Sequence, residues 1–109
     1  MARIPLSICL TGDKAALRLV LEPATGPVQR HSATGIVDVG EGGRLLSIEV
    51  EMARGTDPLF IDIDPPSGTL SRTAVASITV ETGIAGTVSA ITLPRRGHGY
   101  EITYPSGNQ

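Results

Sequence analysis

The residues best placed to do chemistry in this sequence are four carboxylates between positions 49 and 64. The runs 46–52 and 59–63 alternate apolar and polar residues, which is typical of strands that bury one face. If the apolar positions of both runs face a core, alternation turns the carboxylates together to the opposite face: Glu49, Glu51, Asp62 and Asp64. Such a patch can pair with arginines of another strand or chain, and its oxygens are ligands that a hard cation such as Ca²⁺ prefers.

Electrostatics limits what this patch can do. Two like charges at about 5 Å repel by roughly 1 kcal/mol in water and by about 3 kcal/mol at an effective dielectric of 20, so the patch is tolerable in solvent and costly when covered without counter-charges. Ca²⁺ needs roughly six to eight oxygens, which flat strands rarely bring together, so we expect no metal site. Two interpretations are left: a solvated face that resists aggregation, and a charged interface with a basic partner.

A second group of polar side chains lies between Arg95 and Tyr100. Two guanidinium groups and an imidazole on a hairpin tip offer forked donors to a carboxylate or a phosphate. The corresponding tip of the preceding hairpin, residues 53–57, also contains Arg-Gly, so part of this segment belongs to the turn itself. The sequence permits either a solvated turn or a site for a small anion or a carbohydrate, formed by Arg95, Arg96, His98 and Tyr100.

Catalytic patterns are missing from the sequence. It contains no nucleophile elbow, no histidine pair with metal-ligand spacing and no phosphate-binding loop. The glycines at 40–43 lie between predicted strands, whereas a dinucleotide-binding fingerprint must open a helix. These observations favour a protein without enzymatic activity and without a cofactor.

The elements that must position these groups are predicted strands. Apolar residues alternate at a period of two in residues 17–21, 48–52, 59–63 and 100–104, and no run shows a clean helical stripe. Glycine-containing stretches between paired runs predict three hairpins. After each hairpin, Pro followed by Thr-Gly or Ser-Gly indicates a corner, because Pro donates no ladder hydrogen bond and Gly permits positive φ.

The same order of elements recurs along the chain. The phrases LRLVLEPATG from Leu17 and LFIDIDPPSG from Leu59 begin 42 positions apart, and YEITYPSG from Tyr100 is a shorter third copy. A long run follows each of the first two corners, and the third copy ends after its hairpin. This predicts two and a half internal repeats, at about residues 1–42, 43–85 and 86–109, stacked because none buries its apolar face alone.

The length of 109 residues fits one domain, residues 1–109, with a single modest core. The spacing of the turn signals predicts an all-β fold, an antiparallel sandwich or barrel of about eight to ten strands. The incomplete third copy leaves two outcomes open. Either the ends of the sheet close on each other within the chain, or an open strand edge pairs with another chain.

Composition restricts the partners and the location. A net charge of −2, from nine basic and eleven acidic residues, lacks the basic surface that neutralises a phosphate backbone, so we expect no nucleic-acid partner. No run approaches the roughly 18 to 20 apolar residues that cross a bilayer, and the start lacks a signal-peptide pattern, so we expect a soluble, cytoplasmic protein with no membrane partner. The only cysteine, Cys9, lies in an apolar run and is expected to be buried and inert.

Three segments of the chain carry a family resemblance: Asp13-Lys-Ala-Ala-Leu17-Arg-Leu19, Asp57-Pro-Leu59-Phe60-Ile61 and the stretch GRLLSIEV at 43–50. They resemble short bacterial domains of unknown function, in which an Asp precedes a Leu-Tyr-Ile strand and a Gly-x-Leu-x-x-Ile-Glu segment closes the unit. The match covers the first unit and, more loosely, the second. It departs at Arg18, where that pattern prefers an aromatic residue, and from Arg95 onward. The resemblance implies no activity, because the family has none assigned.

Together these patterns predict a non-catalytic structural or interaction protein that self-associates into a homo-oligomer through β-strand edges or sheet faces. Another protein is a further candidate partner. The alternative is a small-ligand module, for an anion or a carbohydrate, that uses the hairpin from Arg95 to Tyr100.

Overall fold

The structure, a computed structural model, describes residues 2–11, 15–53, 55–63, 69–97 and 100–102. These residues form strands and one short 3-10 turn, η1 (Glu41–Gly43). Within the described ranges, no helix is long and apolar enough to cross a membrane. In chain order the strands are β1 (Ser7–Leu10), β2 (Ala16–Val20), β3 (Gln29–Gly40), β4 (Leu45–Val50), β5 (Leu59–Asp62), β6 (Leu70–Thr82), β7 (Val88–Pro94), β8 (Arg96–Gly97) and β9 (Tyr100–Glu101).

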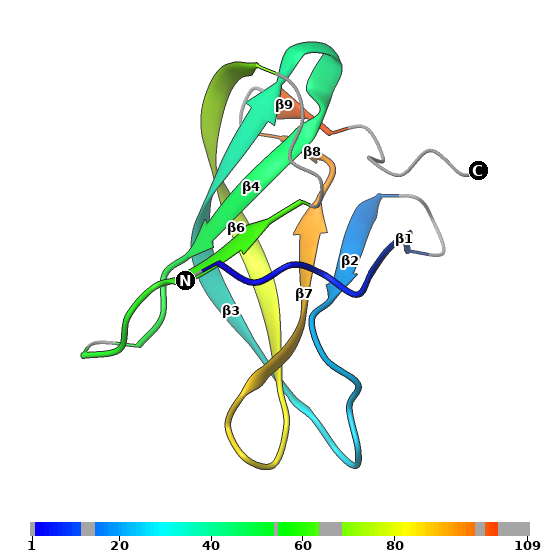
Figure 1. Ribbon diagram of the computed structural model, residues 1–109, viewed down its shortest axis with the longest axis vertical. Helices are drawn as coiled ribbons and strands as arrows, with labels where there is room; N and C mark the ends of the chain where they lie inside the picture. The colour runs from blue at the N-terminus through cyan, green and yellow to red at the C-terminus, as the bar shows by residue number, and fades with distance from the viewer. Residues whose placement is uncertain (1, 12–14, 54, 64–68, 98–99, 103–109) are drawn as a thin grey trace.

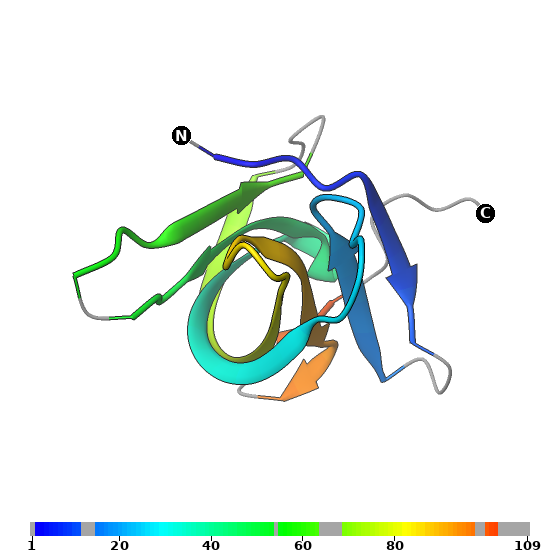
Figure 2. The ribbon, with the colours of Figure 1, turned by 90° about the horizontal axis from the view of Figure 1, so that it is seen from below.

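Seven of these strands form one antiparallel sheet in the order β1-β2-β7-β6-β3-β4-β5, and β8 and β9 form a separate two-stranded ribbon (Figure 1). The sheet curls into a half-barrel, which is seen end-on in Figure 2. The chain is thus all-β and antiparallel, as the alternation in the sequence predicts. The expected sandwich or barrel takes the form, in the described residues, of a single curled sheet.

The centre of the sheet is the pairing of its two long strands. β3 and β6 pair over twelve positions, from Gln29 opposite Thr82 to Gly40 opposite Leu70. β4 joins one side of this ribbon through β3, and β7 joins the other side through β6. The hairpin partners β5 and β2 then extend the sheet outward in the two directions.

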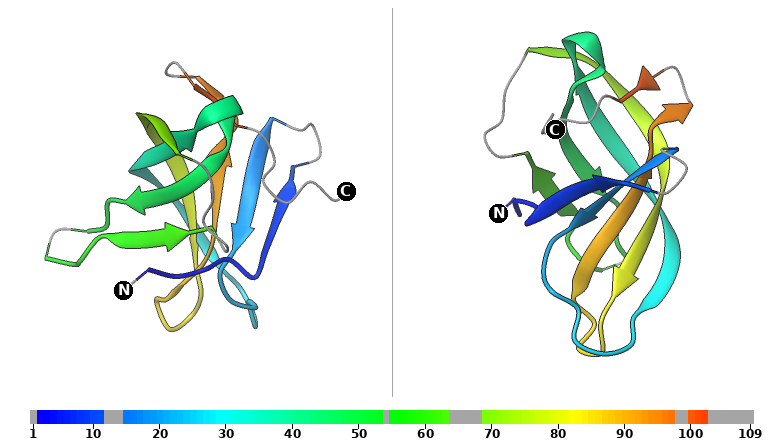
Figure 3. Two further views of the ribbon diagram at one scale, coloured as in Figure 1. Left: turned by 45° about the horizontal axis from the view of Figure 1, so that its top comes forward. Right: turned by 90° about the vertical axis from the view of Figure 1, so that its right-hand side faces the viewer.

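The N-terminal segment contacts both ends of the sheet (Figure 3). The Arg3 N–H donates to the Phe60 carbonyl of β5 at 2.8 Å, and the Arg3 carbonyl accepts from the Asp62 N–H at 2.8 Å. The chain then enters β1, which pairs with β2 at the opposite edge. This single bridge at Arg3 links the two edges of the curled sheet.

The core fills the inner face of the sheet and is aliphatic. The alternation predicted for residues 17–21 and 59–63 is confirmed, because every second residue there is buried or half-buried in the core. Ile102, just after β9, is also fully buried and closes one end of the core. The side chains with no exposed surface are Leu17, Leu19, Val37, Val50, Ile61, Val80, Ile91, Leu93 and Ile102.

Two expectations about local structure are wrong. The run at 88–94, β7, does not pair with residues 100–102 as the third predicted hairpin requires; it lies between β2 and β6, and the described part of that hairpin is the ribbon of β8 and β9. Cys9 is exposed rather than buried, because its neighbours Ile8 and Leu10 take the inner positions of β1. Its Sγ lies 3.8 Å from the Arg18 carbonyl.

The close approach of β3 to β6 and β4 makes Gly35 sensitive to substitution. A Cβ added there would overlap Ile78 Cδ1 in the core and would lie 3.1 Å from the Glu49 carbonyl oxygen. We expect Gly35→Ala to lower the free energy of unfolding by about 1–3 kcal/mol, measured by chemical denaturation. Gly83→Ala is the matched control, since no atom lies within 4 Å of its Cβ position. Equal stability of the two variants would contradict this packing.

Candidate interaction face

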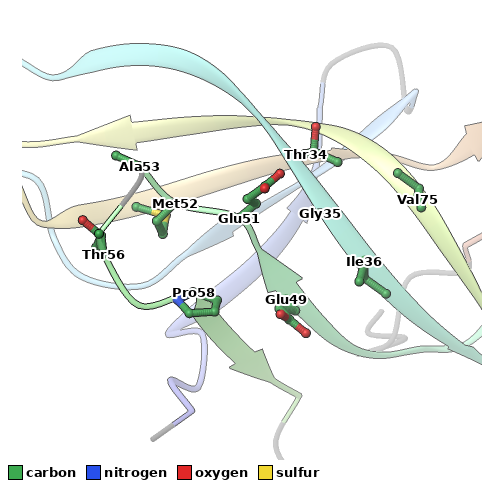
Figure 4. A pocket seen from close by; sticks show the side chains of 11 residues that line it. Thr34, Gly35, Ile36, Glu49, Glu51, Met52, Ala53, Thr56, Pro58 and Val75 are labelled. Carbon is green, nitrogen blue, oxygen red and sulfur yellow. The ribbon is translucent and has the colours of Figure 1, made fainter.

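A groove of about 510 Å³ lies on the outer face of the sheet, opposite the core. Its floor comes from β3, β4 and β6, and the connection between β4 and β5, residues 51–58, forms its far wall. Figure 4 shows the side chains of Val75, Ile36 and Glu49 on three neighbouring strands, with Met52 and Pro58 on the connection. The lining mixes branched apolar groups with the carboxylates of Glu49 and Glu51.

The register of the sheet places four of these outer-face residues in one row. Val75 of β6 lies opposite Ile36 of β3, Ile36 lies opposite Glu49 of β4, and Glu49 lies opposite Phe60 of β5. We call these four residues the outer row. Its three apolar members are unusually exposed: Val75 by 56%, Ile36 by 43% and Phe60 by 42%. An apolar row across neighbouring strands is a surface that association would cover.

Carboxylates lie within the outer row and beside it. Glu49 and Glu51 lie in the groove, as part of the four-carboxylate patch predicted from the sequence. Asp62 lies in an adjoining hollow of about 120 Å³ together with Asp38 of β3. The structure therefore places three of the four predicted carboxylates on one face, while Asp64 lies outside the described residues.

The carboxylates of this face make few hydrogen bonds within the described chain. Ser47 donates to Asp38 Oδ2 at 2.7 Å, and within the described chain neither Glu49 nor Glu51 has a side-chain hydrogen bond or ion pair. Among the same residues, no group of three or more His, Cys, Asp or Glu side chains has an arrangement that could hold a metal ion. The face can therefore supply apolar contact and negative charge.

The opposite half of the sheet presents a different row at the matching place. There the register joins Ser32, Thr79, Thr92 and Arg18, which are all polar. Arg18 crosses β7 and donates two hydrogen bonds to the Glu81 carboxylate, from Nε and from Nη2, each at 3.0 Å. Glu81 is only 3% exposed. In this half of the sheet, the charge of Glu81 is therefore neutralised by Arg18 of the same chain.

The two hydrogen bonds between Arg18 and Glu81 shift the pKa values of both side chains. Hydrogen bonds from Arg18 lower the pKa of Glu81, and they outweigh the burial that would raise it. The same hydrogen bonds raise the pKa of Arg18. The pair is ionised at neutral pH and stabilises the sheet, without a free charge to offer a ligand.

The second predicted site, at the C-terminal hairpin, has its described guanidinium groups engaged within the chain. Arg95 Nε donates to the Ile102 carbonyl at 3.2 Å, and Arg96 Nε pairs with Glu101 Oε2 at 3.0 Å. Tyr100 is placed in β9, whereas its side chain and His98 lie outside the described residues. Each of these two guanidinium groups thus has one acceptor in its own chain, and the Arg96 side chain is largely exposed.

Sequence reasoning did not single out Ile36, Val75 or Phe60. A signal was present in the strand pattern, because Ile36-Val37 and Ala74-Val75-Ala76 put a branched apolar residue where alternation expects a polar one. Asp38 was missed because its proximity to Ser47 depends on strand register.

Comparison with known proteins adds no assignment: no protein-family model, curated protein or solved structure matches this chain significantly.

The stabilisation from Glu81 should depend on pH. Because its pKa is lower in the folded protein than in the unfolded chain, the stabilisation is present above the unfolded-state pKa and is lost as pH falls through the folded-state pKa. We expect Glu81→Gln to be less stable by on the order of 1–2 kcal/mol at pH 7, with the difference shrinking below about pH 4. Denaturation of both proteins from pH 7 to pH 3 measures this.

Glu101→Gln is the control, since its pair with Arg96 is exposed and should contribute little. A difference between wild type and Glu81→Gln that stays constant with pH would contradict the role given to the ion pair.

Proposed function

We propose that this protein is a non-catalytic association module that forms a homo-oligomer through the half of its sheet made by β6, β3, β4 and β5. The single observation that carries the proposal is the outer row, with its three exposed apolar side chains. The groove beside it adds concave surface on the same half of the sheet. We also propose that the protein is cytoplasmic, as expected from the sequence.

Comparison of the two halves supports the choice of surface. The halves have similar strand pairing, yet one carries the outer row and the other carries the polar row with its Arg18–Glu81 pair. If the apolar residues served only the fold, both halves would need them. On the outer face of the sheet they occur in one half only, which favours a contact with another molecule there; other exposed apolar side chains, Leu6 and Ile84, lie outside the strands.

Magnitudes show what this contact requires. Complete burial of a Val, Ile or Phe side chain contributes about 1.5–3 kcal/mol, and these three are already about half buried, so the outer row offers on the order of 3–4 kcal/mol. Micromolar association needs about 8 kcal/mol. The apolar row must therefore act together with other groups, such as unpaired backbone at a strand edge.

We further propose that the two halves are copies of one duplicated unit, β2-β3-β4 and β5-β6-β7. Two matching irregularities support this. The register shifts between Asp38 and Val39 where β3 meets β4, and again 43 positions later where β6 meets β7, between Glu81 and Thr82. The crossed pairing of β2 with β7 and of β5 with β4 is also reciprocal.

A pair of hydrogen bonds in the turns supports the same unit. The Gly40 N–H donates to the Arg44 carbonyl at 2.7 Å, and the Gly83 N–H donates to the Thr87 carbonyl at 3.0 Å, again 43 positions on. The proposed unit begins at β2, later than the boundary of about residue 1 inferred from the sequence. β1 is then an addition to the first unit, and the second unit takes in β7, which the sequence analysis assigned to the partial third copy at about residues 86–109.

The alternative function, binding of a small anion or carbohydrate at the C-terminal hairpin, gains no support from the described residues. Arg95 and Arg96 donate to acceptors of their own chain. The second protein partner considered from the sequence would use the same outer row, with Glu49 and Glu51 offering charge to basic residues.

Light scattering coupled to size-exclusion chromatography tests the proposal. We expect wild type to have at least twice the monomer mass of 11.3 kDa at micromolar concentration. Val75→Lys should shift the protein toward monomer, because a lysine on an apolar contact or an edge strand opposes association. Ser32→Lys is the matched control at the corresponding place in the other half and should leave the mass unchanged. A wild-type protein that is monomeric throughout would refute self-association.

A further inference from the structure

We infer that self-association occurs at the edge of β6 around Thr73 and Val75, which pairs antiparallel with the same edge of a second copy across a twofold axis. This inference rests on the proposed function and names its contact. The two copies would form one continuous sheet through neighbouring β6 strands.

The first observation is that β6 is paired on one side only over half of its length. β3 accompanies β6 from Leu70 to Thr82, whereas β7 pairs with it only from Thr79 to Thr82. β7 then leaves to continue along β2 as far as Pro94. Within the described chain, residues 70–77 therefore have β3 as their only strand partner.

The direction of the backbone groups follows from the register. The Glu51 N–H donates to the Thr34 carbonyl, so Thr34 faces β4 and its neighbour Gly35 faces β6. Gly35 lies opposite Ala76, so Ala76 and, by alternation, Ala74 face β3. The N–H and C=O groups of Thr73 and Val75 consequently point away from β3, toward a side where no strand of the described residues pairs with them. Further along β6, Ser71 and Arg72 share a hollow with Glu101 of β9 on the surface.

The side chains at this edge are suited to a contact. Val75 is the first member of the outer row, at 56% exposure, and Leu70 at the start of the strand is 54% exposed. Thr73 is exposed as well. Residues 73–75 carry no charged side chain, and the exposed Arg72 directly before them is the one charged residue of the stretch 70–77.

Two other strand edges of the described chain differ from this one. Arg3 is bound to β5 through two backbone hydrogen bonds. The edge of β3 that corresponds to the open edge of β6 carries Arg30 and His31, both exposed. Charged side chains at a strand edge are a usual defence against pairing.

A second copy is the occupant that fits this edge. An antiparallel strand edge is complementary to itself under a twofold axis, because each residue offers one donor and one acceptor to its counterpart. Exchange between Thr73 of one copy and Val75 of the other, and the reverse, satisfies all four residues' outward groups. Val75 of each copy then lies beside the other copy's β6.

Charge decides between edge pairing and stacking of the two outer faces. Stacking would cover Glu49 and Glu51 of both copies at about 10 Å, and the described residues that line the groove include no basic side chain. Edge pairing separates the two Glu49 side chains by five strand spacings, about 24 Å, which exceeds a Debye length of about 8 Å at physiological salt. Pairing through β6 therefore covers Val75 and leaves the acids away from the contact.

The test uses the full chain and the variants Val75→Pro and Val75→Thr, with mass measured by sedimentation velocity. Proline removes the outward N–H of residue 75 without removing a hydrogen bond to β3, so we expect the dimer dissociation constant to rise at least about tenfold while the far-ultraviolet circular dichroism stays unchanged. Threonine keeps the N–H and the β-branched shape, so Val75→Thr should remain dimeric. If Val75→Pro does not fold, Thr73→Pro replaces it, because its N–H has the same direction.

The possible results distinguish pairing through the β6 edge from self-association in general. A monomeric wild type refutes both self-association and the edge. A dimer that persists in the folded proline variant overturns the edge and leaves association through the face. Loss of the dimer in both Val75→Pro and Val75→Thr also overturns the edge, since the side chain and not the backbone would then be decisive.

Discussion

The long pairing of β3 with β6 is the constraint on which the rest of the structure depends. Twelve residue pairs hold these strands together, and every other strand of the sheet is attached to one of them directly or through a neighbour. Because β4 and β7 are shorter, each accompanies its long strand for only part of the way. The same pairing that builds the core therefore leaves a one-sided stretch on each long strand, at diagonally opposite places.

The two one-sided stretches have the same geometry and different side chains. On β3 the stretch carries Arg30 and His31, and on β6 it carries Arg72, Thr73 and Val75, the last of which belongs to the outer row. The neighbouring acids differ in the same sense: Glu81 is held by Arg18, whereas Glu49 stays open to solvent. A single backbone arrangement thus supports one closed half and one half suited to association.

Alternation in the sequence was enough to predict the all-β class, the first two hairpins and the face shared by Glu49, Glu51 and Asp62, because a strand fixes side-chain direction at a period of two. It could not predict that β7 pairs with β2 and β6, since local pattern carries no information on distant partners. The outer row was missed for that reason: Val75 and Ile36 become neighbours only through the β3–β6 register. Cys9 was expected to be buried because it lies in an apolar run. In β1, however, it alternates with Ile8 and Leu10, which face the core, so its own side chain faces outward.

Residue-resolved amide hydrogen exchange on wild type, over a range of protein concentrations, tests the edge contact most directly. The amides of Thr73 and Val75 face outward from β6, and those of Arg30 and Ser32 face outward from β3 at the corresponding places. If copies pair through β6, exchange at Thr73 and Val75 slows as concentration rises, while Arg30 and Ser32 stay fast. Equally fast exchange at all four amides at every concentration would contradict the account.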